Sequence, residues 1–338
     1  MEPKIAVNKF PLLKAPWLVI QNVITCMTPY EALHLSLCSK RLQALTAYFT
    51  RRQRYHLHFT AEKVLEVSLE LPNSHDSFVF KFSNNVLCLY LGYKSAWHKG
   101  KHRPHLSDQL HVVKSLLADL TCLYSISFSI AELHLDHWEY SNPELLYNWL
   151  NSFGNNIQHA RIYGDAISSV GYQKFLENFH FSKTACMHVS RKSDNLPEMF
   201  CEDLHMDPAC WLTLDDLLNM KNCVTARLDD VGLSDESLNA FLKCVIRGHL
   251  PKLEYIKMSL GRGYDGDKII KGIEMFHEDS GRVFRRHFIE QLDEGGHYFQ
   301  LDSGEIATIF FYPEEEEEED MEPDSIGVVV WRRDSIHH

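Results

Sequence analysis

The chain has 338 residues, of which 45% are hydrophobic and 24% are charged, a balance typical of a globular protein. This length allows one large domain and a smaller one. No apolar stretch reaches the roughly 18 residues that a membrane-spanning helix needs. The first ten residues, MEPKIAVNKF, lack the long apolar core of a signal peptide. We therefore expect no membrane among the partners.

The net charge of −12 is concentrated near the C-terminus. Six glutamates and Asp320 form the run 314–320, and Glu322 and Asp324 follow. Removing these nine acids leaves −3, so the rest of the chain is nearly neutral. Nucleic-acid binding requires a basic face, and we expect no nucleic acid as a partner. The acidic run is more typical of a solvated loop than of a site for a basic partner.

The nine cysteines are an odd number and contain no C-x-x-C pair and no zinc-finger spacing. Free thiols fit a reducing compartment, so we expect the protein to be cytoplasmic or nuclear. Most of these thiols are expected to be small core residues.

Residues 10–49 read as three short helices. Pro16 suits the first helical position, and apolar residues then recur at three- and four-residue steps from Trp17 to Met27. Thr28-Pro29-Tyr30-Glu31 fits a capping box at the start of a second helix. Ser39 is placed to cap a third helix.

These helices carry more apolar surface than about forty residues can bury among themselves. The surplus favours a docking module. The alternative is an ordinary helical start to a larger core, and the pattern alone does not decide between them.

The same stretch resembles an F-box, the module that binds a Skp-type adaptor in cullin-based ubiquitin ligases. The resemblance rests on Pro16, the spacing of Val23-Ile24 and Met27, Pro29, and Leu37-Cys38. Leu18 and Lys40-Arg41 depart from the acidic and basic–tryptophan residues of many F-boxes. The resemblance implies an adaptor-binding set of Pro16, Leu18, Val19, Val23, Met27, Pro29, Ala32, Leu33, Leu37 and Cys38.

The second half of the chain repeats an apolar-x-apolar core at intervals of 17 to 30 residues. The six cores are Leu133-x-Leu135, Ala160-x-Ile162, Met187-x-Val189, Leu204-x-Met206, Ala226-x-Leu228 and Ile256-x-Met258. Helical patterns lie between most of them, for example the one capped by Ser234 and ended by Gly248. No helical pattern lies between 189 and 204, where we expect an irregular turn. Alternation of strand and helix favours parallel strands with helices packed outside.

The segment 211–258 and the closing segments 297–312 and 326–331 resemble an F-box-associated domain of type 2, which a family large in nematodes joins to an F-box. The ending reads as a hairpin turning at Asp302-Ser303-Gly304, followed by a final strand from Ile326 to Trp331. An earlier hairpin is expected from 78–82 and 86–91.

The expected fold class is α/β: an N-terminal three-helix F-box, then an irregular leucine-rich-repeat-like strand–helix array with a C-terminal β-hairpin. The expected domains are an F-box at 1–50, a connecting segment at 51–128, and an F-box-associated domain at 129–338 with an acidic insertion at 313–324.

No pattern in the sequence indicates an active site, a cofactor or a metal. Gly261 to Gly266 fits G-x-G-x-x-G and precedes the apolar positions Ile269, Ile270, Ile273 and Phe276 of an expected helix, but it closes the strand series instead of opening a βαβ unit. His98, His102 and His105 have helical spacing, yet Gly100 and Pro104 break a helix there. The pairs Asp215-Asp216 and Asp229-Asp230 are poor general acid–base pairs because adjacent residues point apart.

We therefore expect a non-catalytic substrate-recognition subunit of a Skp–cullin–F-box ubiquitin ligase. Its partners are a Skp-type adaptor, through it a cullin scaffold, and a protein substrate. The alternatives are a free-standing repeat protein for protein–protein interaction, whose helical start caps the array, and, less favoured, a nucleotide-binding enzyme that uses the 261–266 loop.

Overall fold

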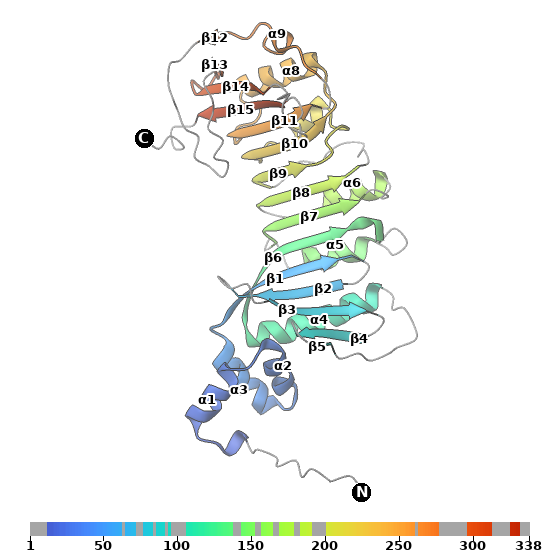
Figure 1. The fold of residues 1–338 in the computed structure, drawn as a ribbon, viewed down its shortest axis with the longest axis vertical. Coiled ribbons are helices and arrows are strands. Elements are labelled where there is room, and N and C mark those ends of the chain that lie inside the picture. The colour runs from blue at the N-terminus through green and yellow to red at the C-terminus, as the bar shows by residue number, and fades with distance from the viewer. Residues whose placement is uncertain are drawn as a thin grey trace. The chain divides into compact units, whose positions relative to one another are not determined.

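The structure is a computed structural model, and its elements are drawn in Figure 1. It describes residues 12–62, 65–71, 77–83, 86–91, 94–95, 106–137, 143–152, 157–164, 169–178, 183–190, 201–260, 263–276, 296–312 and 325–331. The chain forms two compact units. Unit 1 comprises Met1–Phe59 with Val64–Phe128, and unit 2 comprises Thr60–Lys63 with Ser129–His338. Each is described by itself.

Unit 1 contains helices followed by antiparallel strands. Its helical elements are η1 (Leu12–Lys14), α1 (Trp17–Thr25), α2 (Pro29–Leu37), α3 (Lys40–Thr50) and α4 (Leu106–Leu123). Its strands are β1 (Arg54–Ala61, in unit 1 to Phe59), β2 (Leu65–Glu70), β3 (Ser77–Ser83), β4 (Val86–Leu91) and β5 (Lys94–Ser95).

The boundaries of the first helices follow from their caps. Glu31 N–H donates to Thr28 Oγ1 at 3.3 Å and Thr28 N–H donates to Glu31 Oε2 at 2.9 Å, which completes the expected capping box. Ser39 Oγ accepts from Leu42 N–H at 3.2 Å. Pro16 was expected as the first helical residue but is the cap of α1, because its backbone is extended with ψ 147°, and the helix begins one residue later at Trp17.

The helices of unit 1 are tied to the rest of that unit. Thr50 Oγ1 at the end of α3 donates to the carbonyl oxygen of Leu123 at the end of α4, at 2.8 Å. Ser125 N–H donates to the carbonyl oxygen of Gln53 at 3.1 Å. Strands β2, β3 and β4 pair antiparallel, so the hairpin expected from 78–82 and 86–91 is confirmed.

Unit 2 alternates strands and helices and ends in antiparallel strands. Its helical elements are η2 (Leu135–His137), α5 (Pro143–Asn151), α6 (Ser169–Asn178), α7 (Leu214–Leu218), α8 (Asp235–Ile246) and α9 (Gly266–Ile269). Its strands are β6 (Ser125–His134, in unit 2 from Ser129), β7 (His159–Gly164), β8 (Thr184–Val189), β9 (Asp203–Met206), β10 (Thr225–Val231), β11 (Tyr255–Leu260), β12 (Met275–Phe276), β13 (His297–Gln300), β14 (Ile306–Tyr312) and β15 (Ser325–Trp331).

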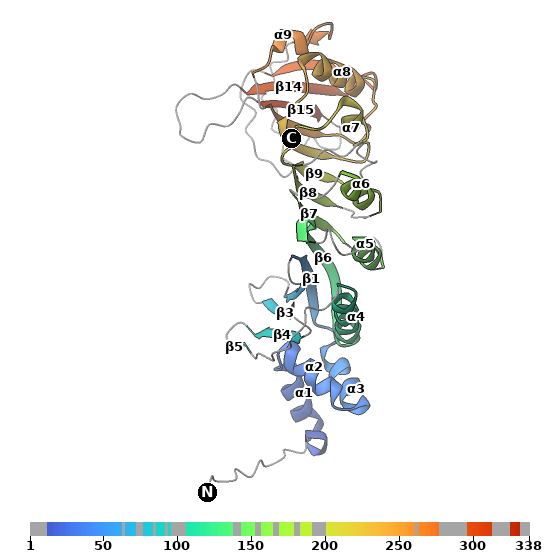
Figure 2. The ribbon, with the colours of Figure 1, turned by 90° about the vertical axis from the view of Figure 1, so that its right-hand side faces the viewer.

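Strands β6 to β11 are parallel and neighbour one another in chain order. Five of the six apolar-x-apolar cores fall wholly on these strands, and the first runs from Leu133 in β6 to Leu135 in η2. Alternate residues of β7, β8 and β9 are buried, and helices α5 to α8 lie together on one side of the strands (Figure 2). We call the opposite, partly exposed side the open face.

The C-terminal strands extend this sheet in antiparallel fashion in the order β11-β15-β14-β13-β12. Tyr255, Phe310, Val329 and Trp331 form a buried cluster there. The indole N–H of Trp331 donates to Thr308 Oγ1 at 2.6 Å, which satisfies a buried donor. The hairpin turn at 302–304 and the final strand are both confirmed, and Gly304 has φ +85° at the turn.

One expected helix is wrong. The apolar positions from Ile269 to Phe276 were expected to continue a helix after the 261–266 loop, but α9 ends at Ile269 and Met275–Phe276 form β12. Gly272 at φ +72° places the chain in the left-handed region between them, which ends helical geometry. Gly248 at φ +75° ends α8 as expected.

Several expectations lie at least partly outside the described residues. These are the His98–His105 cluster, the start of the 261–266 loop, the turn between 189 and 204, and the acidic insertion.

Candidate docking surfaces

Large hydrophobic side chains are exposed on the helices of unit 1. Among the described residues, those at least 36% exposed are Leu13, Trp17, Leu18, Val19, Val23, Leu37, Tyr48 and Val112. All but Val112 precede β1, and none belongs to unit 2. The exposed apolar surface of the described chain is therefore concentrated on η1 to α3. We call the exposed side chains of α1 to α3 (Trp17, Leu18, Val19, Val23, Leu37 and Tyr48) the helical surface.

Aromatic contacts join α1 to α3 within the helical surface. The Trp17 ring lies 5.7 Å from Tyr48 and 4.8 Å from Phe49, measured between ring centroids. Trp17 is 53% exposed and Tyr48 is 69% exposed. These rings hold each other in place while leaving much of their area open to a partner, which is the behaviour of an aromatic anchor.

The ten residues of the expected adaptor-binding set divide by burial. Six are exposed: Pro16, Leu18, Val19, Val23, Leu37 and Cys38. Met27 is half-buried. Pro29, Ala32 and Leu33 are buried in unit 1.

Trp17 and Tyr48 were missed as candidate contact residues. The spacing placed Trp17 in one apolar stripe of α1 with Ile20 and Ile24, but only those two isoleucines are buried. A helix with apolar residues at 17–20 and 23–24 is apolar on more than one side. This wide apolar surface was the feature of the sequence that could have indicated that some of these residues are exposed. Nothing in the sequence singled out Tyr48.

The open face of unit 2 carries a row of rings across four parallel strands, β6 to β9. Tyr163 of β7 stacks on His134 of β6 at 4.6 Å and on His188 of β8 at 5.1 Å between ring centroids. His188 meets His205 of β9 edge-on at 5.7 Å. The register of the strands aligns these rings, because His134, Tyr163 and His188 are Cα partners.

Carboxylates orient each histidine of this row. His134 Nε2 lies 3.1 Å from Glu132 Oε1, His188 Nδ1 lies 3.7 Å from Asp207 Oδ2, and His205 Nε2 lies 2.8 Å from Asp229 Oδ2. The sequence offered no signal for this row, since its members are spread over residues 132–229 and meet only through strand register.

The contact between His205 and Asp229 shifts the pKa of both groups. Hydrogen bonds to Asp229 and to Cys186 raise the pKa of His205 to about 9, against the opposing effect of burial. Burial acts to raise the pKa of Asp229, but the His205 hydrogen bond and the Arg227 charge outweigh it and the pKa is lowered. The pair is therefore an imidazolium–carboxylate pair at neutral pH.

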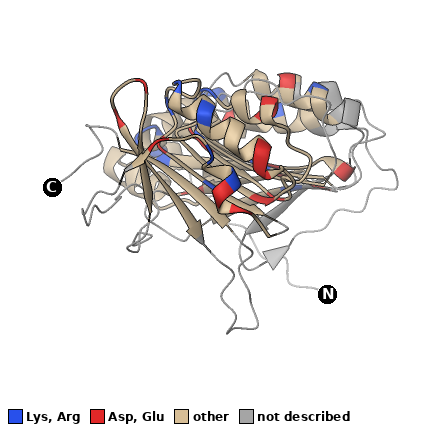
Figure 3. Ribbon diagram, turned by 90° about the horizontal axis from the view of Figure 1, so that it is seen from above, with Lys and Arg blue, Asp and Glu red and all other residues tan. Residues whose placement is uncertain are grey.

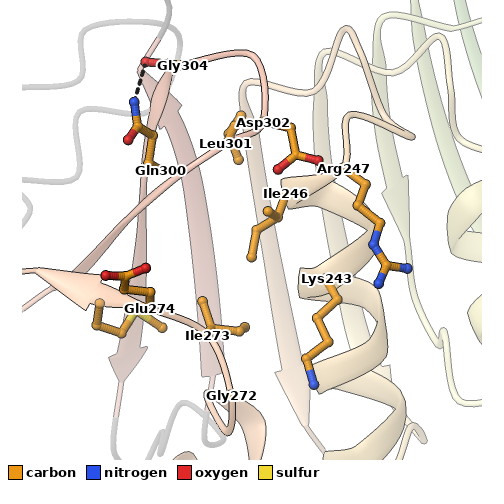
Figure 4. Close-up of a pocket in the computed structure, with 11 residues that line it drawn as sticks. Lys243, Ile246, Arg247, Gly272, Ile273, Glu274, Gln300, Leu301, Asp302 and Gly304 are labelled. Atoms are coloured by element: carbon orange, nitrogen blue, oxygen red, sulfur yellow. Dashed lines mark hydrogen bonds between the residues drawn. The ribbon is translucent and has the colours of Figure 1, made fainter.

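A cavity of about 740 Å³ lies in unit 2 beside the end of α8. Ile246, Ile273 and Leu301 provide apolar walls, and Lys243, Arg247 and Asp302 bring charges of both signs (Figure 4). Its size suits a small molecule or a few peptide side chains.

The charges of the described residues are mixed in sign. Figure 3 shows Lys and Arg interspersed with Asp and Glu over the helices. Within the described ranges, no three or more His, Cys, Asp or Glu side chains are placed to hold a metal ion. No helix in the described part of the chain is both long and apolar enough to cross a bilayer.

Comparison with known proteins adds one finding. A family model described as F-box associated matches residues 194–258. The chain therefore carries an F-box-associated segment, which spans β9, α7, β10, α8 and most of β11 and includes both His205 and Asp229. No curated protein and no solved structure matches the chain.

Proposed function

We propose that this chain is a substrate-recognition subunit of a cullin-based ubiquitin ligase. Helices α1 to α3 form an F-box that binds a Skp-type adaptor through the helical surface, and the F-box-associated region in unit 2 binds a protein substrate. The chain performs no chemistry on the substrate in this account. It works in a reducing cytoplasmic or nuclear compartment.

The observation that carries this proposal is the pairing of an exposed apolar helical surface with an F-box-associated segment in one chain. A helical module that leaves a tryptophan, a tyrosine and two leucines largely exposed lacks the burial that would stabilise it alone. Covering each large side chain with a partner contributes roughly 1.5–3 kcal/mol. A Skp-type adaptor is the occupant that the F-box resemblance of 10–49 implies.

The gain in ubiquitin transfer comes from proximity. Holding the substrate and the conjugating enzyme in one assembly raises the effective concentration of substrate lysines near the reactive thioester. The F-box and the substrate-binding region thus have separate tasks, and each is open to separate mutation.

The proposal is tested by titrating a purified Skp-type adaptor into the full-length protein by calorimetry. Val23→Asp places a charge on α1 at a position 36% exposed, so it should remove measurable binding while the protein stays folded. Val112→Asp is the matched control, because Val112 is 45% exposed on α4 and lies outside the helical surface. Equal adaptor affinity for both variants would contradict the assignment of the surface.

A second candidate is a free-standing protein–protein interaction module. It is favoured by the hydrogen bond from Thr50 to Leu123, which ties α3 to α4 within unit 1. This candidate predicts that hydrogen exchange in α1 to α3 is as slow as in the core of unit 1 and does not slow further when adaptor is added. The ligase proposal predicts additional protection of α1 on adaptor binding.

A further inference from the structure

The cavity beside the end of α8 lies between that helix and two later segments of unit 2, and hydrogen bonds hold both segments to the helix (Figure 4). Asn239 in α8 donates through Nδ2 to the carbonyl oxygens of Ile269 at 2.6 Å and Lys271 at 3.0 Å. On the other side, the Asp302 N–H donates to the carbonyl oxygen of Ile246 at 2.9 Å. Both walls are thus in place before a ligand arrives, which lowers the cost of binding.

Four charged side chains line this cavity. Lys243 and Arg247 are four residues apart and therefore lie on the same side of the helix end. The glycine at 272 leaves the Lys243 ammonium group open to the cavity, because a side chain at that position would begin 3.8 Å from Lys243 Nζ. Glu274 and Asp302 add two carboxylates, so the lining carries equal numbers of positive and negative charges.

These four charges are available to a ligand. Arg247, Glu274 and Asp302 are exposed, and Lys243 is half-buried. Within the described part of the chain, none of the four side chains forms an ion pair or a side-chain hydrogen bond. Charged groups that are already partly shielded from water and lack a partner can form charge-assisted hydrogen bonds with a ligand at little cost.

An apolar surface lies beside the two cations. In the view of Figure 4, Ile246 and Ile273 lie between Glu274 on one side and Lys243 and Arg247 on the other. An anionic group held by the two cations is therefore next to an apolar wall. The matching ligand has a carboxylate close to an apolar side chain, with hydrogen-bond donors further away.

The last residue of a protein has this combination when its side chain is apolar, because the terminal carboxylate and the side chain share one Cα. In an extended segment, an internal aspartate or glutamate carries the carboxylate on its own side chain, and its neighbours point to the opposite side. A dianionic phosphate is disfavoured, because it would meet two carboxylates as well as two cations.

We propose that this cavity binds the C-terminal end of a substrate protein whose last residue is apolar. The terminal carboxylate accepts hydrogen bonds from Lys243 and Arg247, and the last side chain packs on Ile246 and Ile273. Glu274 accepts from an N–H of a preceding residue. Lys243, Ile246 and Arg247 belong to the F-box-associated segment. The inference rests on the proposed substrate-binding role of unit 2 and specifies which part of the substrate is bound.

The test measures the binding of peptide pools to the full-length protein by fluorescence polarisation. The first pool is fluorescein-labelled GSGXXXL with a free C-terminal carboxylate, where X is any amino acid except cysteine. The second is the same pool with an amidated C-terminus, and the third ends in serine in place of leucine. The free-acid leucine pool should bind at least about tenfold more tightly than either of the others.

Two results would overturn the proposal at this stage. One is equal binding of the free-acid and amidated leucine pools. The other is no binding of the free-acid pool up to about 1 mM, the limit of a weak single contact. An amidated pool GSGXXDL places the carboxylate inside the chain. Tighter binding of that pool than of the free-acid pool would assign the cavity to an internal acidic residue and would also overturn the proposal.

Substitutions locate the binding to the cavity. Lys243→Met and Arg247→Met each remove a charge while keeping a long apolar side chain, and each should weaken the free-acid pool about tenfold. The matched control is Lys221→Met, because Lys221 is an exposed cation of unit 2 outside the cavity. Equal affinity of the Arg247→Met and Lys221→Met proteins would contradict the site. Circular dichroism checks the fold, and the exposed Arg247 decides if Lys243→Met is destabilised.

Titration of the same proteins with a Skp-type adaptor separates this inference from the ligase proposal. Arg247→Met should bind the adaptor as tightly as the parent chain does, because the helical surface belongs to unit 1. A parent chain that binds the adaptor but none of the peptide pools would overturn this inference alone. A parent chain that binds the free-acid pool but not the adaptor would support the cavity and contradict the ligase proposal.

Discussion

The helical surface of unit 1 and the F-box-associated segment of unit 2 use their apolar residues in opposite ways. In α8, Leu238, Phe241, Leu242 and Val245 are all buried, and the helix rests on its sheet. In α1, only Ile20 and Ile24 are buried, and Trp17, Leu18, Val19 and Val23 are exposed. Both helices are rich in apolar residues, but α8 buries them within unit 2, whereas α1 leaves most of them exposed.

The difference teaches that exposed area, and not apolar content, marks a docking surface. The comparison also distinguishes residues that stabilise the fold from residues that are available for binding. Mutations in the buried set should change the free energy of unfolding, whereas mutations in the helical surface should change affinity for a partner.

The largest expected effect is on the free energy of unfolding, from a mutation among the buried residues of α8. Phe241→Ala removes a fully buried ring from α8 and leaves a cavity, so it should lower the free energy of unfolding of unit 2 by about 3–5 kcal/mol. Urea denaturation followed by circular dichroism measures this loss. A loss below 1 kcal/mol would mean that α8 is not packed as described.

Trp17→Ala is the counterpart on the exposed side. It should weaken adaptor binding by about 2 kcal/mol or more, a factor of roughly 30, because a central tryptophan often dominates such an interface. Its effect on unfolding should stay below about 1 kcal/mol, since half of the side chain is already in water. Calorimetric titration and urea denaturation of the same preparation give both values. A large loss of stability with unchanged affinity would show instead that Trp17 acts as a core residue.

A third prediction concerns the pH dependence of unit 2. The pKa of His205 is raised to about 9 in the folded protein from an ordinary value near 6.5, so protonation favours the fold. The stabilisation is complete below about pH 6.5 and is lost as the pH rises through about 9. Since the pair is partly exposed, we expect it to contribute about 1–2 kcal/mol to the free energy of unfolding.

Asp229→Asn should abolish most of this slope between pH 6.5 and 9. Urea midpoints measured at half-unit pH steps compare the variant with the parent chain. The control variant is Asp302→Asn, because Asp302 is exposed and lies away from the pair. Asp216→Asn is unsuitable as a control, because Asp216 completes a capping box with Thr213. Parallel pH profiles for the parent and Asp229→Asn would contradict the pairing.

The smallest effect is expected at the start of α2. Thr28→Ala removes the hydroxyl that accepts from Glu31 N–H, which should cost about 1 kcal/mol of stability in unit 1. Thermal unfolding detects this loss. Thr28→Ser retains the hydroxyl and should recover most of it, and a Ser variant as unstable as the Ala variant would exclude capping as the cause.

Much of the fold could be predicted from the sequence because its signals are local. The capping box at Thr28, the caps at Ser39 and Ser234, and the glycine at 248 each fix a helix boundary through neighbouring backbone groups. The six strand cores were visible because each alternates apolar and polar residues over a few positions. The helix expected after Asp265 failed because the single residue Gly272 overrides the apolar spacing around it.

The candidate sites were less predictable because they depend on register and burial. His134, Tyr163 and His188 span more than fifty residues of sequence and become neighbours only when β6, β7 and β8 pair in parallel. The expected adaptor set was a mixture for a similar reason. Spacing places Leu33 and Leu37 on one helix, but only packing decides that Leu33 is buried and Leu37 exposed.

The most direct test of the central claim is size-exclusion chromatography with light scattering on the full-length protein mixed with a purified Skp-type adaptor. The account predicts a stable 1:1 complex that the Val23→Asp variant fails to form. Absence of a complex with the unmodified protein, shown to be folded by circular dichroism, would contradict it. The exposed helical surface would then belong to a different partner.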